Sequence, residues 1–393
     1  MISSTSHSDP ILFQLFVVFA VAKLAAEIFE RLKQPAVVGE ILAGVLLGPS
    51  VLGWIHGGEL LSALSEIGVV FLLFTVGLEV KPSSLFKVGR RAFSVASLGV
   101  LVPFIMGWGL MRIHGELPLQ QIFIGAALVA TRGGITARGL AGLGKLSSET
   151  AQIILAAAVI DDILGLLILS GVSALAKGHL NYMELATTAG LSIAFILFMI
   201  FLSSRLMKKS QGLLDKLKVG HAYFVVGLIL CFGLSYLATK VGVAAIIGAF
   251  FAGMALSEIS EGTEIHHYSV GVMEFLVPFF LVEIGLQLEL NVFKDWHVIS
   301  LSLLLTVFAV ASKILGCGLG ALGMDKKSIL KIGVGMVPRG EVGIIVAQIG
   351  FSMGVLNSQL YAVVVFMAVA TTLLVPPFLK ILFSSKKRAA RSG

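Results

Sequence analysis

Val159-Ile160-Asp161-Asp162 places two adjacent carboxylates in the middle of the apolar stretch Ala151–Ala174. The stretch is long enough to cross a bilayer, because a transmembrane helix needs about 20 apolar residues. One carboxylate at that depth costs roughly 2.5–3.5 kcal/mol on insertion scales, and a second adds to the cost. A helix cap at the membrane surface is the alternative interpretation, but the central position of the pair argues against it. The pair is therefore predicted to be functional, holding a cation and a proton in turn.

The composition indicates a polytopic membrane protein. The chain has 393 residues, of which 57% are hydrophobic and 13% charged, and its mean hydropathy is +0.99. A soluble domain is about 25% charged. Most basic residues lie between apolar segments, so the net charge of +7 indicates orientation in the bilayer and not nucleic-acid binding. We expect one membrane domain over residues 1–393, without a soluble regulatory domain.

Apolar segments of suitable length are candidates for membrane-spanning helices. The thirteen candidates are 11–30, 36–54, 64–80, 92–112, 120–142, 151–174, 183–205, 220–239, 242–257, 269–288, 298–321, 329–352 and 357–383. The loops between them alternate in basic content, and the positive-inside rule places the basic set in the cytoplasm. The N-terminus is therefore expected outside and the C-terminus in the cytoplasm, which requires an odd number of spans.

The two halves of the chain resemble each other at a nearly constant offset. The matches are Gly39–Gly44 with Gly248–Gly253, Phe71–Leu78 with Phe279–Leu286, and Val129–Gly133 with Met336–Gly340. Matching spans are seven apart in order, an odd number, so the two copies are predicted to face opposite sides of the membrane. We expect an all-α protein with 13 transmembrane helices in two inverted six-helix repeats, at about 11–174 and 220–383, joined by a linker helix at about 183–205.

Two repeat-related spans carry helix-breaking residues near their centres, in Thr131-Arg132-Gly133-Gly134 and Pro338-Arg339-Gly340. Interrupted backbone at membrane depth occurs where protein buries it or where it lines a wet cavity. The ends of the half-helices then direct N–H groups and carbonyls at whatever lies between them. Kinks without function are the alternative for one helix, but two kinks at related positions favour a site.

The repeat is expected to lose its symmetry at the charged residues. Asp161 and Asp162 map near Ala368 and Val369, which are apolar, and Lys313 maps to an apolar position in the first half. Adjacent carboxylates titrate as a coupled pair, and one stays protonated unless a cation comes close. Two cations are candidates, a substrate ion and Lys313, and their competition would couple cation to proton. Snorkelling of Lys313 to the interface is the alternative.

One other charged pair is predicted from its spacing alone. Lys23 and Glu27 lie four residues apart in the first span, where neighbours on one helix face form ion pairs. We expect this pair to be structural.

These segments resemble the monovalent cation:proton antiporter-2 family, especially short sodium/proton antiporters of the NapA type. The resemblance covers essentially all spans and rests on Gln34–Glu40, Ala130–Arg138, Val159–Asp162, Ser312–Gly316 and Val337–Glu341. It implies an NhaA-like fold with crossing discontinuous helices, and a core domain that moves against a dimerisation domain. It also implies a homodimer, with no cofactor.

The resemblance also implies roles for individual residues. Asp162 looks like the ion-binding carboxylate, and Asp161 looks like the carboxylate that pairs with Lys313 until sodium binds. Thr131 looks like an oxygen ligand from the interrupted helix, so the transported Na⁺ is expected on Asp162, Asp161 and Thr131. Aspartate pairs typify electrogenic members of the family, which exchange two protons for one sodium ion.

The chain departs from the family pattern beside the expected site. Arg132-Gly133 follows Thr131 where relatives usually have a small polar residue and then Val. A positive charge there opposes cation binding, and Glu283 stands where relatives tend to have a small residue. Our hypothesis is that Arg132 and Glu283 form a compensating buried pair. Arg339 and Glu341 are further candidate modulators, with Glu341 expected to pair with Arg339 or to line the cytoplasmic funnel.

The sequence therefore predicts an electrogenic sodium/proton antiporter of a bacterial-type inner membrane, driven by the proton gradient. Li⁺ and K⁺ are alternative substrates, and potassium/proton exchange at the same site is the nearest alternative function. A channel, or a cotransporter of the related bile-acid-symporter fold, is an alternative of another class. The sequence contains no nucleophile–base motif and no cofactor loop, so we do not expect an enzyme.

Overall fold

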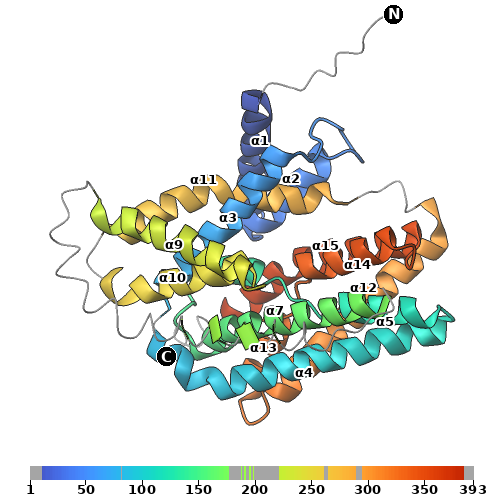
Figure 1. The fold of residues 1–393 in the computed structure, drawn as a ribbon. Coiled ribbons are helices and arrows are strands. Elements are labelled where there is room, and N and C mark those ends of the chain that lie inside the picture. Colours follow the sequence, from blue (N-terminus) through green and yellow to red (C-terminus); the bar gives the residue numbers. More distant parts are fainter. Residues whose placement is uncertain are drawn as a thin grey trace, which may run out of the picture.

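The computed structural model describes residues 11–80, 82–176, 187, 190–191, 194–195, 198, 221–260, 264–288 and 294–384. The long regular elements in this part of the chain are α-helices (Figure 1). In chain order they are α1 (Ile11–Arg31), α2 (Ala36–Leu47), α3 (Glu59–Leu78), α4 (Pro82–His114), α5 (Pro118–Ala127), α6 (Gly133–Gly142), α7 (Glu149–Ala176), α9 (Ala222–Lys240), α10 (Ala245–Ser260), α11 (Ile265–Leu286), α12 (Trp296–Gly320), α13 (Lys326–Gly335), α14 (Glu341–Ser352) and α15 (Ser358–Ser384).

Within the described residues, eight helices are long and apolar enough to cross a membrane, and three shorter helices are also apolar. The all-helical membrane architecture agrees with the expected fold class. The predicted span 36–54 is a shorter helix than expected, because α2 ends at Leu47 and the chain turns from Gly48 onward. The predicted spans 120–142 and 329–352 are each divided in two, as α5 with α6 and α13 with α14. Most of the predicted linker helix at 183–205 lies outside the described residues.

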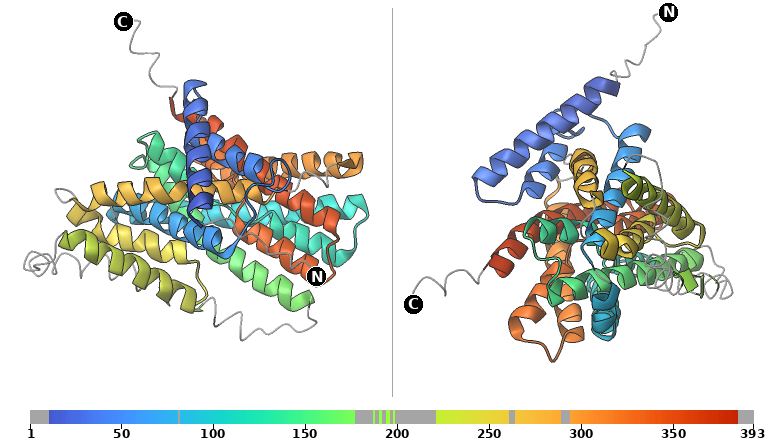
Figure 2. Two further views of the ribbon diagram at one scale, coloured as in Figure 1. Left: turned by 90° about the horizontal axis from the view of Figure 1, so that it is seen from above. Right: turned by 90° about the vertical axis from the view of Figure 1, so that its left-hand side faces the viewer.

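The helices form two groups (Figures 1 and 2). In the first, which we call the α3 group, α3 packs against α10 and α11, α2 packs against α1 and α11, and α9 covers α10. In the second, the α4 group, α4 packs against α5, α7 and α12, while α15 packs against α12, α13 and α14. Helix α6 packs against α7 and α15 of its own group and against α2 and α3 of the other. The boundary between the groups therefore runs along α6.

Glycines bring the helices of the α3 group into close contact at two equivalent crossings. Where α2 crosses α11, a side chain at Gly44 would meet the carbonyl of Val282, and one at Gly285 would meet that of Ile41. Where α10 crosses α3, Gly253 faces the carbonyl of Phe74 in the same way, and Gly77 faces that of Phe250. These are the segments matched in the sequence comparison of the two halves, so the same packing device occurs twice.

Candidate functional site

The two interrupted helices meet in the interior of the α4 group. Thr131, between α5 and α6, forms an isolated antiparallel bridge with Arg339, between α13 and α14. The N–H of Arg132 donates to the carbonyl of Pro338 at 2.7 Å. Some backbone N–H and carbonyl groups lose their helical partners at the interruptions. They form hydrogen bonds across the crossing instead, as buried backbone groups in an apolar interior require.

Asp161, near the middle of α7, contacts Lys313 of α12 beside this crossing. Both side chains are fully buried, and Lys313 Nζ lies 2.8 Å from Asp161 Oδ1. The ammonium also donates to the carbonyls of Gly99 at 2.7 Å and Val129 at 2.8 Å. These three acceptors use all three donors of a charged lysine. Lys313 thus points into the protein and does not snorkel to an interface.

Asp161 also holds the first interruption in place. Its second oxygen, Oδ2, accepts the backbone N–H of Thr131 at 2.9 Å. The hydroxyl of Thr131 donates to the carbonyl of Met336, at the second interruption, at 3.3 Å. One carboxylate therefore connects the lysine of α12 with the backbone of the broken helix.

Asp162 points elsewhere, because successive residues of a helix lie about 100° apart around its axis. It is 9% exposed and lines a cavity of about 20 Å³, enough for about one water molecule. Gly133 and Gly134, at the start of α6, form one wall. Leu73 of α3 and Phe250 of α10 form the opposite wall. The cavity therefore lies between the two helix groups.

Arg132 extends across the same boundary between the groups. Its guanidinium lies 4.6 Å from the ring centroid of Phe280 on α11, and its side chain is buried. Glu283 lies three residues further along α11 and is half-buried. The residue that Arg132 contacts, Phe280, thus lies about one helical turn from Glu283. The predicted ion pair between them stays a prediction.

Arg339 is fully buried and occupies the second interruption. Its guanidinium donates to the carbonyls of Ala309 at 2.6 Å and Val129 at 3.3 Å. Its backbone N–H donates to Thr371 Oγ1 of α15 at 3.2 Å. Glu341 begins α14, and its side chain lies outside the described residues.

Thr371 is the site residue that the sequence comparison missed. The offsets of 207 to 209 between the halves placed apolar residues opposite the aspartates, whereas the structure gives Thr371 the backbone contact that Asp161 makes in the first half. The difference between their numbers, 371 − 161 = 210, lies outside the range of 207 to 209, so Asp161 and Thr371 are related by their contacts and not by the sequence match of the halves. Thr371-Thr372 is a polar pair in the last span, but threonine hydroxyls are easily satisfied within a helix and did not by themselves indicate a site.

The arrangement suits ion exchange. A buried carboxylate already shared by a lysine can accept another cation only if the lysine leaves or loses its proton. The neighbouring carboxylate, Asp162, lines a cavity between the two helix groups. The expected site residues Asp161, Lys313, Thr131 and Arg339 lie in one cluster, Asp162 and Arg132 border it, and Glu283 lies across the boundary.

Comparison with known proteins gives matches along nearly the whole chain. GerN of Bacillus cereus, a Na⁺/H⁺-K⁺ antiporter, is 34% identical over 97% of this chain and 98% of its own length. NhaS3 of Synechocystis, a high-affinity Na⁺/H⁺ antiporter, is 33% identical over 96% of this chain and 91% of its own length. A Na⁺/H⁺ antiporter of Enterococcus hirae is 33% identical over 93% of this chain and 96% of its own length.

A solved structure has the same fold. The sodium proton antiporter MjNhaP1 from Methanocaldococcus jannaschii, at pH 8, superposes with a TM-score of 0.66 at 19% identity, over 95% of this chain and 98% of that one. The family model described as "Sodium/hydrogen exchanger, transmembrane" matches residues 16–384. The chain therefore belongs to the transmembrane sodium/hydrogen exchanger family.

Proposed function

We propose that this chain is a secondary antiporter that exchanges Na⁺ for protons across the membrane, with Asp162 as the principal ion ligand. The observation that carries the proposal is the buried Lys313–Asp161 pair at 2.8 Å, beside the crossing of two interrupted helices. The family and the names of the similar proteins agree with cation/proton exchange.

In this proposal Na⁺ and protons exclude one another at the aspartate pair. Na⁺ binds Asp162 and draws Asp161 away from Lys313, and oxygen atoms of Thr131 complete part of its coordination shell. Lys313 then stands buried without its carboxylate, a costly state for an ammonium, so it releases a proton. Asp162 releases a second proton when Na⁺ binds. Two protons per Na⁺ move one net charge, which makes the exchange electrogenic.

Alternating access is proposed to arise from movement of the α4 group against the α3 group. The Asp162 cavity lies between these groups, with walls from α6 and α7 on one side and α3 and α10 on the other. Sliding α6 along α3 would expose Asp162 to one side of the membrane at a time. We propose 13 transmembrane helices in two inverted repeats, and the equivalent glycine crossings α2–α11 and α3–α10 support this arrangement.

The chain is further proposed to act as a homodimer in the inner membrane, with its N-terminus outside and its C-terminus in the cytoplasm. The basic loops support this orientation. Exposed apolar side chains on α1 support contact of this helix with a partner chain or with lipid. Leu12 is 78% exposed and Phe16 is 68% exposed.

The test is proton movement driven by sodium in proteoliposomes. A pH-sensitive dye inside the vesicles should respond when Na⁺ is added to wild type, and the response should be lost in Asp162→Asn. Asp161→Asn should change the coupling or abolish exchange. Full activity in both variants would remove the assigned site.

The same assay separates the alternative substrates and functions. Li⁺ and K⁺ replace Na⁺ in turn, and a K⁺ response equal to the Na⁺ response would favour potassium/proton exchange, for which the name of GerN provides a precedent. A channel, or a cotransporter of bile-acid-symporter fold, would not move protons in obligatory exchange for the cation.

A further inference from the structure

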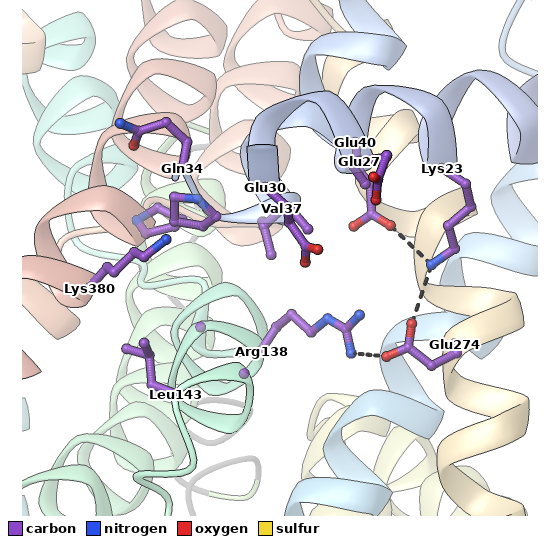
Figure 3. A pocket seen from close by; sticks show the side chains of 16 residues that line it. Lys23, Glu27, Glu30, Gln34, Val37, Glu40, Arg138, Leu143, Glu274 and Lys380 are labelled. Atoms are coloured by element: carbon purple, nitrogen blue, oxygen red, sulfur yellow. Dashed lines mark hydrogen bonds and ion pairs between the residues drawn. The ribbon is translucent and has the colours of Figure 1, made fainter. Parts of the chain in front are cut away.

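A larger cavity, of about 660 Å³, lies at one end of the boundary between the two helix groups (Figure 3). Residues from α1, α2 and α11 line it on one side, and residues from α6 and α15 line it on the other. Its volume corresponds to roughly 20 water molecules. None of its lining residues also lines the Asp162 cavity, so the two cavities are separate in this conformation.

Four charged side chains form a connected network in the larger cavity (Figure 3). Lys23 of α1 lies 3.3 Å from Glu40 of α2 and 3.3 Å from Glu274 of α11. Glu274 also accepts from Arg138 of α6 at 2.7 Å. The expected pairing of Lys23 with Glu27 is wrong, because tertiary contacts bring two other carboxylates to the lysine and Glu27 pairs with Arg31.

The Arg138–Glu274 pair joins the two helix groups at a fixed distance along the helices from the Asp162 cavity. Arg138 lies six residues after Arg132 along the chain, and Glu274 lies six residues before Phe280. Arg132 and Phe280 are in contact beside the Asp162 cavity. The strip of α6 between the two arginines therefore runs antiparallel to the matching strip of α11. One end of this strip borders the Asp162 cavity and the other borders the larger cavity.

We propose that Arg138 and Glu274 form the gate between the larger cavity and the Asp162 cavity. While the pair is closed it ties α6 to α11 and separates Asp162 from the larger cavity. When the pair opens, α6 and the α4 group move away from α11, and ions reach Asp162 from that side. This side is the cytoplasm in the proposed orientation, since the larger cavity includes the basic end of α1.

The rest of the network makes the gate reversible. When Arg138 leaves, Glu274 keeps Lys23, so no carboxylate of the gate is left without a cation. Glu40, which is 1% exposed and accepts only from Lys23 among the described residues, holds the lysine on the α3 group. The Glu274 side chain is 45% exposed and that of Arg138 is 15% exposed. Because Glu274 is half-exposed, water can solvate its carboxylate when Arg138 leaves, so opening this pair costs less than opening a fully buried one.

The other charged residues of the cavity do not bridge α6 and α11. Glu27 pairs with Arg31 of the same helix, and Glu30 is exposed on α1. Lys380 of α15 donates to the carbonyl of Lys33 at 2.7 Å, at the exposed rim. This separates the gate from the remaining charges and supplies a matched control, Glu27→Gln.

The test measures access to the Asp162 cavity, not transport. Val159 lines that cavity, so Val159→Cys is introduced in a Cys231→Ala/Cys317→Ala background. A membrane-impermeant cationic thiol reagent is applied to inside-out and right-side-out vesicles. We expect Arg138→Gln and Glu274→Gln each to speed modification from the larger cavity's side by about fivefold, the shift expected for losing an ion pair of this exposure. Modification from the opposite side should slow or stay unchanged.

Controls separate a gate from general loosening of the structure. Glu27→Gln makes the same chemical change in the same cavity and should leave the rate unchanged. The double variant Arg138→Gln/Glu274→Gln should match Glu274→Gln, because that single change already removes the contacts of Glu274 with both Arg138 and Lys23. Rates equal to the control, or faster modification from both sides, would overturn the proposal.

The inference rests on the proposed alternating access, but its test does not need a sodium gradient. A failed transport assay with successful labelling would contradict the assigned ion exchange and keep the gate. Active transport with unchanged labelling would contradict the gate alone.

Discussion

The two interrupted helices are held in the same way by different chemistry. At the first break the N–H of Thr131 donates to the carboxylate of Asp161 at 2.9 Å, and at the second the N–H of Arg339 donates to the hydroxyl of Thr371 at 3.2 Å. The hydroxyl is neutral, whereas the carboxylate carries a charge that can pair with one cation or with another. The difference agrees with the proposal that ion exchange takes place at the first break and that the second break supports it.

The largest effect is expected when Asp161, which holds the first interruption, is replaced by threonine, the residue type that holds the second. Asp161→Thr keeps an acceptor for the N–H of Thr131 but leaves the Lys313 ammonium buried without a carboxylate. Removing one partner of a buried ion pair costs about 3–5 kcal/mol of folding free energy. We expect a large loss of thermal stability in detergent, together with loss of sodium-driven proton movement.

A second substitution tests the reason for that loss. Asp161→Thr/Lys313→Met removes both charges and should recover most of the stability while remaining inactive, because removing both partners of a buried pair is often neutral. A double variant as unstable as Asp161→Thr would contradict the central place of the ion pair.

A smaller effect is expected at the second break. Thr371→Val has nearly the same shape but removes the acceptor of the Arg339 N–H, and a buried unsatisfied N–H costs about 1–3 kcal/mol. Turnover should fall while the sodium concentration for half-maximal exchange stays the same, since Thr371 touches no ion in this account. Thr371→Ser is the control and should behave as wild type in both measurements.

The smallest effect is expected for Arg132, a charged residue at the first interruption where relatives usually have a small polar residue. If Arg132 and Glu283 compensate each other, Arg132→Ser alone should be harmful and Arg132→Ser/Glu283→Ser much less so. Coupled residues in one network deviate from additivity by about 0.5–3 kcal/mol. Stability and half-maximal sodium concentration measured over this double-mutant cycle decide the matter, and purely additive damage would count against the pairing.

Much of this arrangement was predictable from the sequence because intramembrane charges are costly. The depth of Asp161, Asp162 and Lys313 marked them as functional, and helix-breaking residues marked both interruptions. Thr371 gave no such signal, since a threonine costs little in a membrane helix and can satisfy its hydroxyl within the helix. The sequence match of the halves also placed apolar residues near Ala368 and Val369 opposite the aspartates, so it did not indicate Thr371.

Other features depend on tertiary contacts that local spacing does not specify. Lys23 has Glu27 four residues away, yet it pairs with Glu40 and Glu274 because α2 and α11 approach α1. Likewise, helix periodicity predicts that Asp161 and Asp162 diverge, but only the packing of α7 decides which one faces Lys313 and which one faces the cavity.

Sodium and protons are proposed to compete for the aspartate pair, and proton release upon sodium binding tests this competition directly. Na⁺ is added to purified protein in weakly buffered solution containing a pH indicator, with choline as the control for ionic strength. We expect wild type to acidify the solution on Na⁺ addition and Asp162→Asn not to do so. Sodium binding by wild type without any proton release would contradict it.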